Sequence, residues 1–232
     1  MGESVAIPAA LTDEQQERLR RSVRYVTETA ESVTARLIAE FKRFKEEGTS
    51  DIFDPTLADA RPRERKFALL ADQFIEQRAR MVPYFQGVRR GYEIGVGPGY
   101  LFTMLQQVLG IEMRGCDVDF DGLVVYRELR RALGIEPLVS EFRVAAGADL
   151  PIPPGTDAVI AVAPVFDMGW GVAEHRDFLG MCRAKGVERM IWRLNKHTPE
   201  DILKFYRGFA QFPMAGEDRD AERFCIVPLQ PA

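Results

Sequence analysis

The chain has 232 residues, of which 46% are hydrophobic, 10% aromatic and 28% charged. No run of eighteen apolar positions occurs, so the composition excludes disordered, fibrous and membrane-spanning classes, and the length fits one large domain or one domain with an appended helical piece. The net charge is −4, and residues 1–90 carry 16 basic and 15 acidic side chains. We therefore expect neither nucleic acid nor membrane as a partner.

Cysteine usage and the first residues bear on the compartment. Cys116, Cys182 and Cys225 lie far apart without a CxxC spacing, so neither a disulfide framework nor a metal site is predicted. The start lacks a basic stretch followed by an apolar one, and Ala6 stands where a myristoylation signal requires Ser or Thr. We expect a mature, cytoplasmic protein.

Two helices are predicted before residue 90. Residues 12–47 form the first, with Thr12 or Asp13 as its cap, and Pro62 to about Met81 form the second. Apolar side chains recur in the first at alternating steps of four and three: Leu19, Val23, Val26, Ala30, Val33, Leu37, Phe41 and Phe44. This stripe suits packing onto its own domain, which we expect, or a coiled-coil homodimer, although Glu40 interrupts it.

From Gly91 onward, short apolar runs alternate with helical ones, as in a parallel sheet built of βα units. Strands are predicted near residues 91–96, 112–117, 138–144, 157–163 and 188–194, with 224–227 as an antiparallel edge strand. Helices are predicted at about 100–109, 121–133, 172–184 and 198–211. The fold class is therefore α/β, with a helical extension or lid over residues 1–90 and an α/β domain over 91–232.

A glycine-rich turn follows the first predicted strand. Gly95, Gly97 and Gly99 alternate along it, which allows a sharp turn, close approach of a ligand and close packing of the next helix. The amides that begin that helix suit an anionic group. Tyr100 occupies the next position, so the pattern is GxGxG and fails the GxGxxG of dinucleotide fingerprints.

Two carboxylates flank the turn. Glu93 precedes it at the end of the strand, where it would repel a pyrophosphate but accept hydrogen bonds from an ammonium group. Asp117 ends the second strand, and its two oxygens suit the two hydroxyls of a ribose.

The stretch from Gly91 to about Asn195 resembles the class I S-adenosylmethionine-dependent methyltransferases, whose hallmark is an acidic-x-Gly-x-Gly-x-Gly loop. The resemblance implies a Rossmann-like methyltransferase fold with S-adenosyl-L-methionine as cofactor. By the same resemblance, the glycine loop holds the methionine part, Glu93 lies near its amino end and Asp117 binds the ribose. The further cofactor contacts that it implies are Tyr100, Val118, Ala146 and Ala163.

A narrower likeness concerns Trp170 to Glu174, which is similar to a Trp-Gly-x-x-Glu segment in a group of bacterial methyltransferase-like proteins. Phe166, Trp170 and Glu174 are candidates to line the acceptor site. The chain departs from the family where a Gly-Asp-Ala pattern often binds adenine, because it has Ala145-Ala146-Gly147. That contact is therefore expected from the backbone or from Asp149. The usual antiparallel pair at the sheet edge also shortens to one strand.

The sequence thus predicts a methyltransferase acting on a small molecule. For a hydroxyl acceptor, the candidate bases are Asp167, Glu174 and His175. One alternative is a non-catalytic binding or scaffolding protein that dimerises through its first helix. Another is a nicotinamide-dependent oxidoreductase, which Tyr100 and the long segment before the first strand disfavour.

Overall fold

The computed structural model describes residues 10–47, 61–118, 124–162, 169–194, 197–214 and 223–229. A single sheet of the described residues has the strand order β3-β2-β1-β4-β5-β6. Its strands are β1 (Arg90–Ile94), β2 (Glu112–Asp117), β3 (Val139–Glu141), β4 (Ala158–Val162), β5 (Arg189–Arg193) and β6 (Phe224–Pro228). All neighbours pair in parallel except β5 and β6, which are antiparallel. The predicted Rossmann-like fold is confirmed.

The helices agree closely with the predicted segments. They are α1 (Asp13–Glu47), α2 (Arg61–Met81), α3 (Tyr100–Leu109), α4 (Val124–Ala132), α5 (Val172–Ala184) and α6 (Glu200–Arg207), with short 3-10 helices at Val82–Phe85 and Glu136–Leu138. The last helix ends before the predicted residue 211 because Gly208 follows it and Gln211 instead pairs with Ile226 of β6. Apart from this bridge, β6 is the only antiparallel strand at that edge within the described residues.

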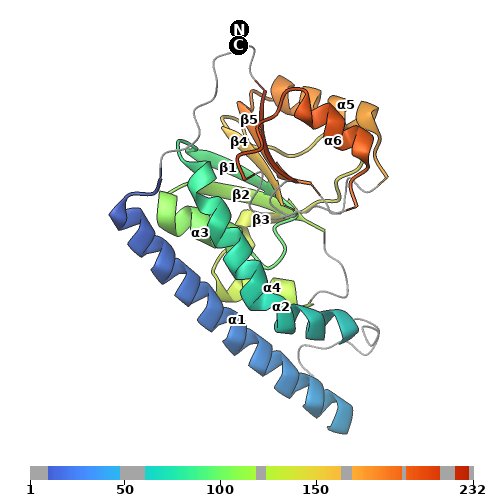
Figure 1. Ribbon diagram of the computed structural model, residues 1–232. Coiled ribbons are helices and arrows are strands. Elements are labelled where there is room, and N and C mark those ends of the chain that lie inside the picture. Colours follow the sequence, from blue (N-terminus) through green and yellow to red (C-terminus); the bar gives the residue numbers. More distant parts are fainter. Residues whose placement is uncertain are drawn as a thin grey trace.

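Side chains of the strands alternate between two hydrophobic layers, as the period of two requires. In β4, Ala158, Ile160 and Val162 pack with residues of α1 to α4, whereas Val159 and Ala161 pack with residues of α5 and α6. Figure 1 shows α5 and α6 on one side of the sheet and the other helices opposite. Full burial of β4 on both faces explains its uninterrupted apolar sequence.

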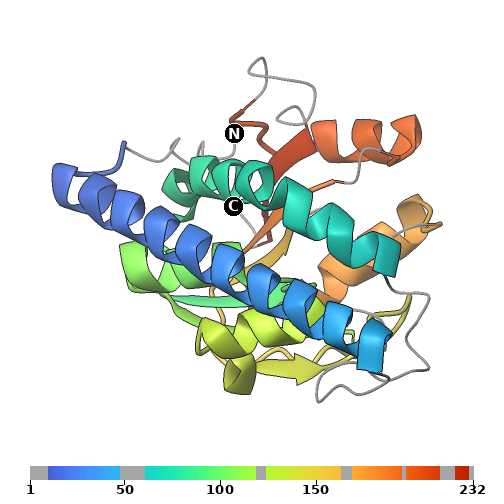
Figure 2. The same ribbon diagram turned by 90° about the horizontal axis from the view of Figure 1, so that it is seen from below.

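The amino-terminal helices form an outer layer over this sheet domain. Helix α1 contacts α2, α3 and α4, and Figure 2 shows it crossing over the other helices. Its predicted stripe faces inward, since Val26, Ala30, Val33 and Leu37 are buried in the same cluster as α3. From Leu19 to Leu37 the stripe is therefore covered within the chain, whereas the side chains of Phe41 and Phe44 lie outside the described part. A coiled-coil dimer through the covered part would require α1 to leave the domain.

Of the described helices, none is long and apolar enough to span a bilayer. The longest, α1, is amphipathic instead, with charged residues over its outer face and ion pairs such as Arg20 to Glu17 at 2.9 Å.

At the amino edge of the sheet, Asp157 joins the starts of two strands. Its Oδ2 accepts hydrogen bonds from the backbone N–H of Arg89 (2.8 Å) and Arg90 (3.0 Å) at the start of β1, next to β4. Burial favours the neutral acid, but the two N–H groups, first that of Arg90, and then the arginine charges lower the pKa of Asp157 on balance. The fold therefore gains stability from the ionised form.

We expect Asp157→Ala to lower the free energy of unfolding by about 2 to 3 kcal/mol at pH 7, because two N–H groups lose a charged acceptor. The folded-state pKa is depressed, so this contribution is present above the ordinary value of 3.8 and is lost as the pH falls below it. Urea titrations of both proteins at pH 7 and pH 3.5 measure the difference. Asp149→Ala is the control, since Asp149 is 83% exposed in its pair with Lys185. An equal effect of the two substitutions would contradict the prediction.

Candidate functional site

The glycine turn between β1 and α3 has an open backbone. Gly95, Gly97 and Gly99 have φ values of 71°, 57° and 85°, in the left-handed region that other residues rarely adopt. Gly95 is exposed, and a Cβ added there would meet no atom within 4 Å. Because α3 begins after Gly99 without a side-chain cap, its first amides remain for a ligand.

Gly99 of the turn and Gly115 of β2 let the turn pack closely against its neighbours. A Cβ on Gly99 would collide with Ile135, which follows α4. In β2, a Cβ on Gly115 would lie 2.6 Å from the carbonyl oxygen of Glu93 and 2.6 Å from Val96. Gly99 thus serves helix packing, whereas Gly95 faces open space.

Asp117 fixes the position of the turn. Its Oδ2 accepts hydrogen bonds from the Gly97 N–H (2.7 Å) and from Nη1 of Arg130 (2.9 Å). Arg130 in turn donates to the Gly97 carbonyl (3.2 Å) and to Glu136 (2.7 Å), so one buried guanidinium links β2, the turn and the segment after α4. Oδ1 accepts one bond from the Val118 N–H and keeps further acceptor capacity.

The side chain of Glu93 lies at the centre of the site without a hydrogen bond to Oε2. It is only 3% exposed, and no described residue reaches that oxygen. Burial raises the pKa of Glu93 to about 8, against the opposing charge of Arg78. A buried carboxyl without a partner costs free energy, and natural proteins keep such groups chiefly where they have a function.

Arg78, from the last turn of α2, is a charged residue near Glu93 that the sequence interpretation did not single out. Burial, then the charge of Arg193, lowers its pKa to about 10, while the charge of Glu93 raises it. Its buried Nη1 has no hydrogen-bond partner among the described residues. The available signal was its position, three residues after Ile75 and three before Met81, on the apolar face of the helix.

Two tyrosines lie beside the turn. The Tyr100 ring is buried in the core next to α2, and burial raises its pKa to about 12, so only its backbone is available at the turn. Tyr126 of α4 lies over Gly97, where an added Cβ would be 3.8 Å from its ring. Burial raises the pKa of Tyr126, and the charge of Asp117 adds to this effect.

The structure brings some of the other predicted cofactor residues to the turn. Val118 is half-buried and follows Asp117, whereas Ala146 is exposed in the loop after β3. Ala163 and Phe166 lie outside the described residues. Asp149 pairs at 2.6 Å with Lys185, between α5 and the start of β5, so it lies at the opposite edge of the sheet from the turn. The expectation that Asp149 contacts adenine is therefore wrong.

The segment Trp170 to Glu174 has a structural explanation. Glu174 accepts a hydrogen bond from the Gly171 N–H (2.9 Å) at the start of α5, so it caps that helix. The half-buried Trp170 packs edge-on against His175, with ring centres 5.7 Å apart. Trp170 and Glu174 are thus engaged in contacts that stabilise the fold, and their role in lining an acceptor site stays a prediction.

His175 is buried among aromatic rings. It is 1% exposed, and its Nδ1 lies 3.0 Å from the Tyr206 hydroxyl. Burial lowers its pKa to about 4, so the ring is neutral at physiological pH. These contacts hold α5 against α6 and do not suit a base that meets a substrate.

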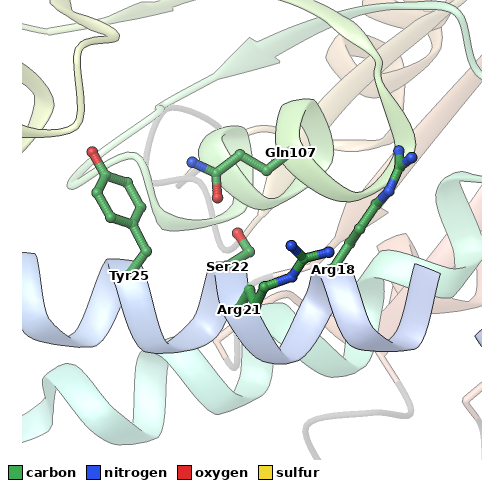
Figure 3. A pocket seen from close by; sticks show the side chains of 5 residues that line it. All are labelled: Arg18, Arg21, Ser22, Tyr25 and Gln107. Atoms are coloured by element: carbon green, nitrogen blue, oxygen red, sulfur yellow. The ribbon is translucent and has the colours of Figure 1, made fainter. Parts of the chain in front are cut away.

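A hollow with a volume of about 400 Å³ lies between α1 and α3. Figure 3 shows its lining residues Arg18, Arg21, Ser22, Tyr25 and Gln107. Gln107 is in the last turn of α3, about 12 Å along the helix from Gly99. This hollow is therefore separate from the glycine turn, and its arginines lie near the carboxyl end of α3, where cations are favourable.

Within the described segments, no three His, Cys, Asp or Glu side chains are placed to hold a metal ion. The cysteines among them, Cys116, Cys182 and Cys225, are all buried free thiols.

Comparison with known proteins gives structural likeness only. No protein-family model matches the chain, and no curated protein matches it either. Among solved structures, it is similar to the pyocyanin biosynthetic protein PhzM (17% identity, 71% of this chain and 57% of that one, TM-score 0.49). It is also similar to the mitomycin 7-O-methyltransferase MmcR (19%, 82% and 53%, TM-score 0.40).

A third similar structure is the N,N-8-amino-8-demethyl-D-riboflavin dimethyltransferase RosA from Streptomyces davawensis. The identity is 17% over 66% of this chain and 47% of that one, with a TM-score of 0.42. The match spans only about half of each of these three chains. At such identities the likeness concerns the fold, and the functional argument rests on this chain's own residues.

We expect Glu93→Gln to stabilise the protein at pH 8 and to change little at pH 4.5. The folded-state pKa of about 8 lies above the ordinary 4.5. The wild type therefore loses stability as the pH rises between these values, by roughly 1.4 kcal/mol per unit at most, and glutamine does not. Chemical denaturation at several pH values measures the gap between the two proteins. A gap that is constant with pH would be incompatible with a strongly raised pKa.

Proposed function

We propose that the protein is an S-adenosyl-L-methionine-dependent methyltransferase that acts on a small molecule. The observation that carries this proposal is the buried, unpartnered Oε2 of Glu93 beside the exposed backbone of Gly95. A carboxyl placed there suits an ammonium group on a ligand that lies against the turn.

The residues present fit this cofactor at three of its parts. Gly95, Gly97 and the first amides of α3 would receive the methionine part, with Glu93 toward its ammonium group. Asp117 would accept a ribose hydroxyl at Oδ1, since its Oδ2 already holds Gly97 and Arg130. No acid stands at Ala145-Ala146-Gly147, so the adenine would be held by backbone groups of that loop.

The bound cofactor supplies an electrophilic methyl group on a sulfonium, so the chain mainly has to position the acceptor in line with it. Ligands of open α/β sheets lie beyond the carboxyl ends of the strands. In this sheet we expect the acceptor beyond the carboxyl ends of β1, β4 and β5. Glu174 and His175 are engaged in the fold. Asp167 lies outside the described residues and stays a prediction as the base for a hydroxyl acceptor.

The alternative of a scaffolding protein that dimerises through its first helix has less support, since the apolar stripe of α1 is buried against α3. A nicotinamide cofactor is disfavoured by Tyr100, which makes the turn GxGxG instead of the GxGxxG of dinucleotide sites. Calorimetric titration with S-adenosylhomocysteine, S-adenosylmethionine and NAD separates the three hypotheses. Micromolar binding of the first two supports the methyltransferase, and binding of NAD alone would refute it.

Gly95→Ala should weaken S-adenosylhomocysteine binding at least about tenfold, because its Cβ enters the space left for the ligand. Gly134→Ala is the matched control. Both glycines have a similar positive φ (71° and 73°) and no atom within 4 Å of the added carbon, so both substitutions cost about 1 kcal/mol of stability. Titration calorimetry and thermal denaturation measure the two effects. Equal affinities of the two variants would rule out ligand contact at Gly95.

Binding of S-adenosylhomocysteine at pH 7 should release a proton. Glu93, with a pKa of about 8, is mostly neutral before binding, and the ligand's ammonium group favours its ionised form. Calorimetry in buffers of different ionisation enthalpy counts the proton, and Glu93→Gln should abolish the release. Identical proton counts for wild type and variant would place the ammonium group elsewhere.

A further inference from the structure

Arg78 and Glu93 are two ionisable side chains near the glycine turn that form no hydrogen bond with each other through Nη1 or Oε2. Tyr92 and Ile94 pack in the layer of α5 and α6, so Glu93, which lies between them on β1, faces the opposite layer. That layer contains residues of α2 and α3, and the charges of Arg78 and Glu93 each shift the pKa of the other. Yet Nη1 of Arg78 and Oε2 of Glu93 are both buried and both lack a hydrogen-bond partner within the described segments. A simple internal ion pair would join these atoms, because breaking or leaving open a buried charge pair is costly.

The two charges come from different parts of the chain. Glu93 belongs to β1 under the turn, whereas Arg78 belongs to α2 in the amino-terminal layer. Helix α2 packs against α3, which begins at the turn, and the Arg78 guanidinium lies 6.0 Å from the centre of the Phe74 ring. That ring contact holds an arginine without using its N–H groups.

The environment of Arg78 favours an anionic ligand. Besides Glu93, the group that acts on its charge most strongly is Arg193 at the end of β5, which is also positive. Asp117 is held by Arg130, with an N–O distance of 2.9 Å, and does not form an ion pair with Arg78. A ligand with a negative group near Arg78 and a positive group near Glu93 would satisfy both orphaned atoms.

We propose that Arg78 binds the α-carboxylate of the cofactor's amino-acid end while Glu93 binds its α-ammonium group. This rests on the proposed function and assigns to the amino-terminal extension a direct part in the cofactor site. An arginine suits the role, since its planar fork donates two parallel hydrogen bonds to a carboxylate. The site then selects a zwitterion, and a nucleoside that lacks the amino acid satisfies neither charge.

The test compares three ligands by titration calorimetry: S-adenosylmethionine, its decarboxylated form, and 5′-methylthioadenosine, which lacks the whole amino acid. The wild type should prefer the first over the second by roughly 10- to 100-fold, as expected for hydrogen bonds to a charged group. In Arg78→Met this preference should fall to about one, with 5′-methylthioadenosine affinity unchanged. Arg80→Met, an exposed arginine of the same helix turn, is the control and should behave as wild type.

The outcomes separate the two hypotheses. If the wild type binds none of the three ligands, the proposed function is wrong. If it binds S-adenosylmethionine but Arg78→Met keeps the preference, or loses all three ligands equally, the role of Arg78 is wrong. Arg78→Lys is a second variant in case Arg78→Met misfolds, because lysine keeps the positive charge but lacks the planar guanidinium. It should keep a reduced preference, and an unchanged one would argue against a bidentate contact.

Discussion

The buried carboxyl of Glu93 is the constraint around which the site is organised. It lies in the middle of a parallel sheet, where an unpartnered polar atom is unfavourable. Its surroundings do not remove that cost: Arg78 lies near but forms no hydrogen bond, and Asp117, already bound to Arg130, adds like charge. The fold therefore maintains an unsatisfied polar atom under an open backbone turn, and this supports the proposed contact with an ammonium group.

Most of the fold could be predicted from the sequence because its signals are local. The glycine turn, the strand ends and the amphipathic stripe of α1 each depend on residues within one element, and the parallel pairing follows from the alternation of strands and helices. Contacts between distant elements were beyond this reasoning. Arg130 holds Asp117 from 13 residues away and Gly97 from 33, and nothing in its sequence neighbourhood marks it as different from Arg131.

The candidate site was predicted best where chemistry and position coincide. Glu93 and Asp117 stand at strand ends, so their meeting at one edge follows from the topology. The predicted contact of Asp149 with adenine was wrong because the segment between β3 and β4 returns the chain to the opposite edge of the sheet, where Asp149 pairs with Lys185. Arg78 was recognisable only as a cation on an apolar face, a pattern that equally describes a side chain whose charged end reaches water.

The shared core of α1, α2 and the sheet domain makes the chain hard to divide. Many proteins vary their specificity by exchanging a peripheral module while the catalytic part stays the same. Here such a graft would uncover the apolar surfaces of α3 and α4, so an exchanged extension would have to reproduce their packing in detail. The extension and the sheet domain therefore have to change together, because they share one hydrophobic core.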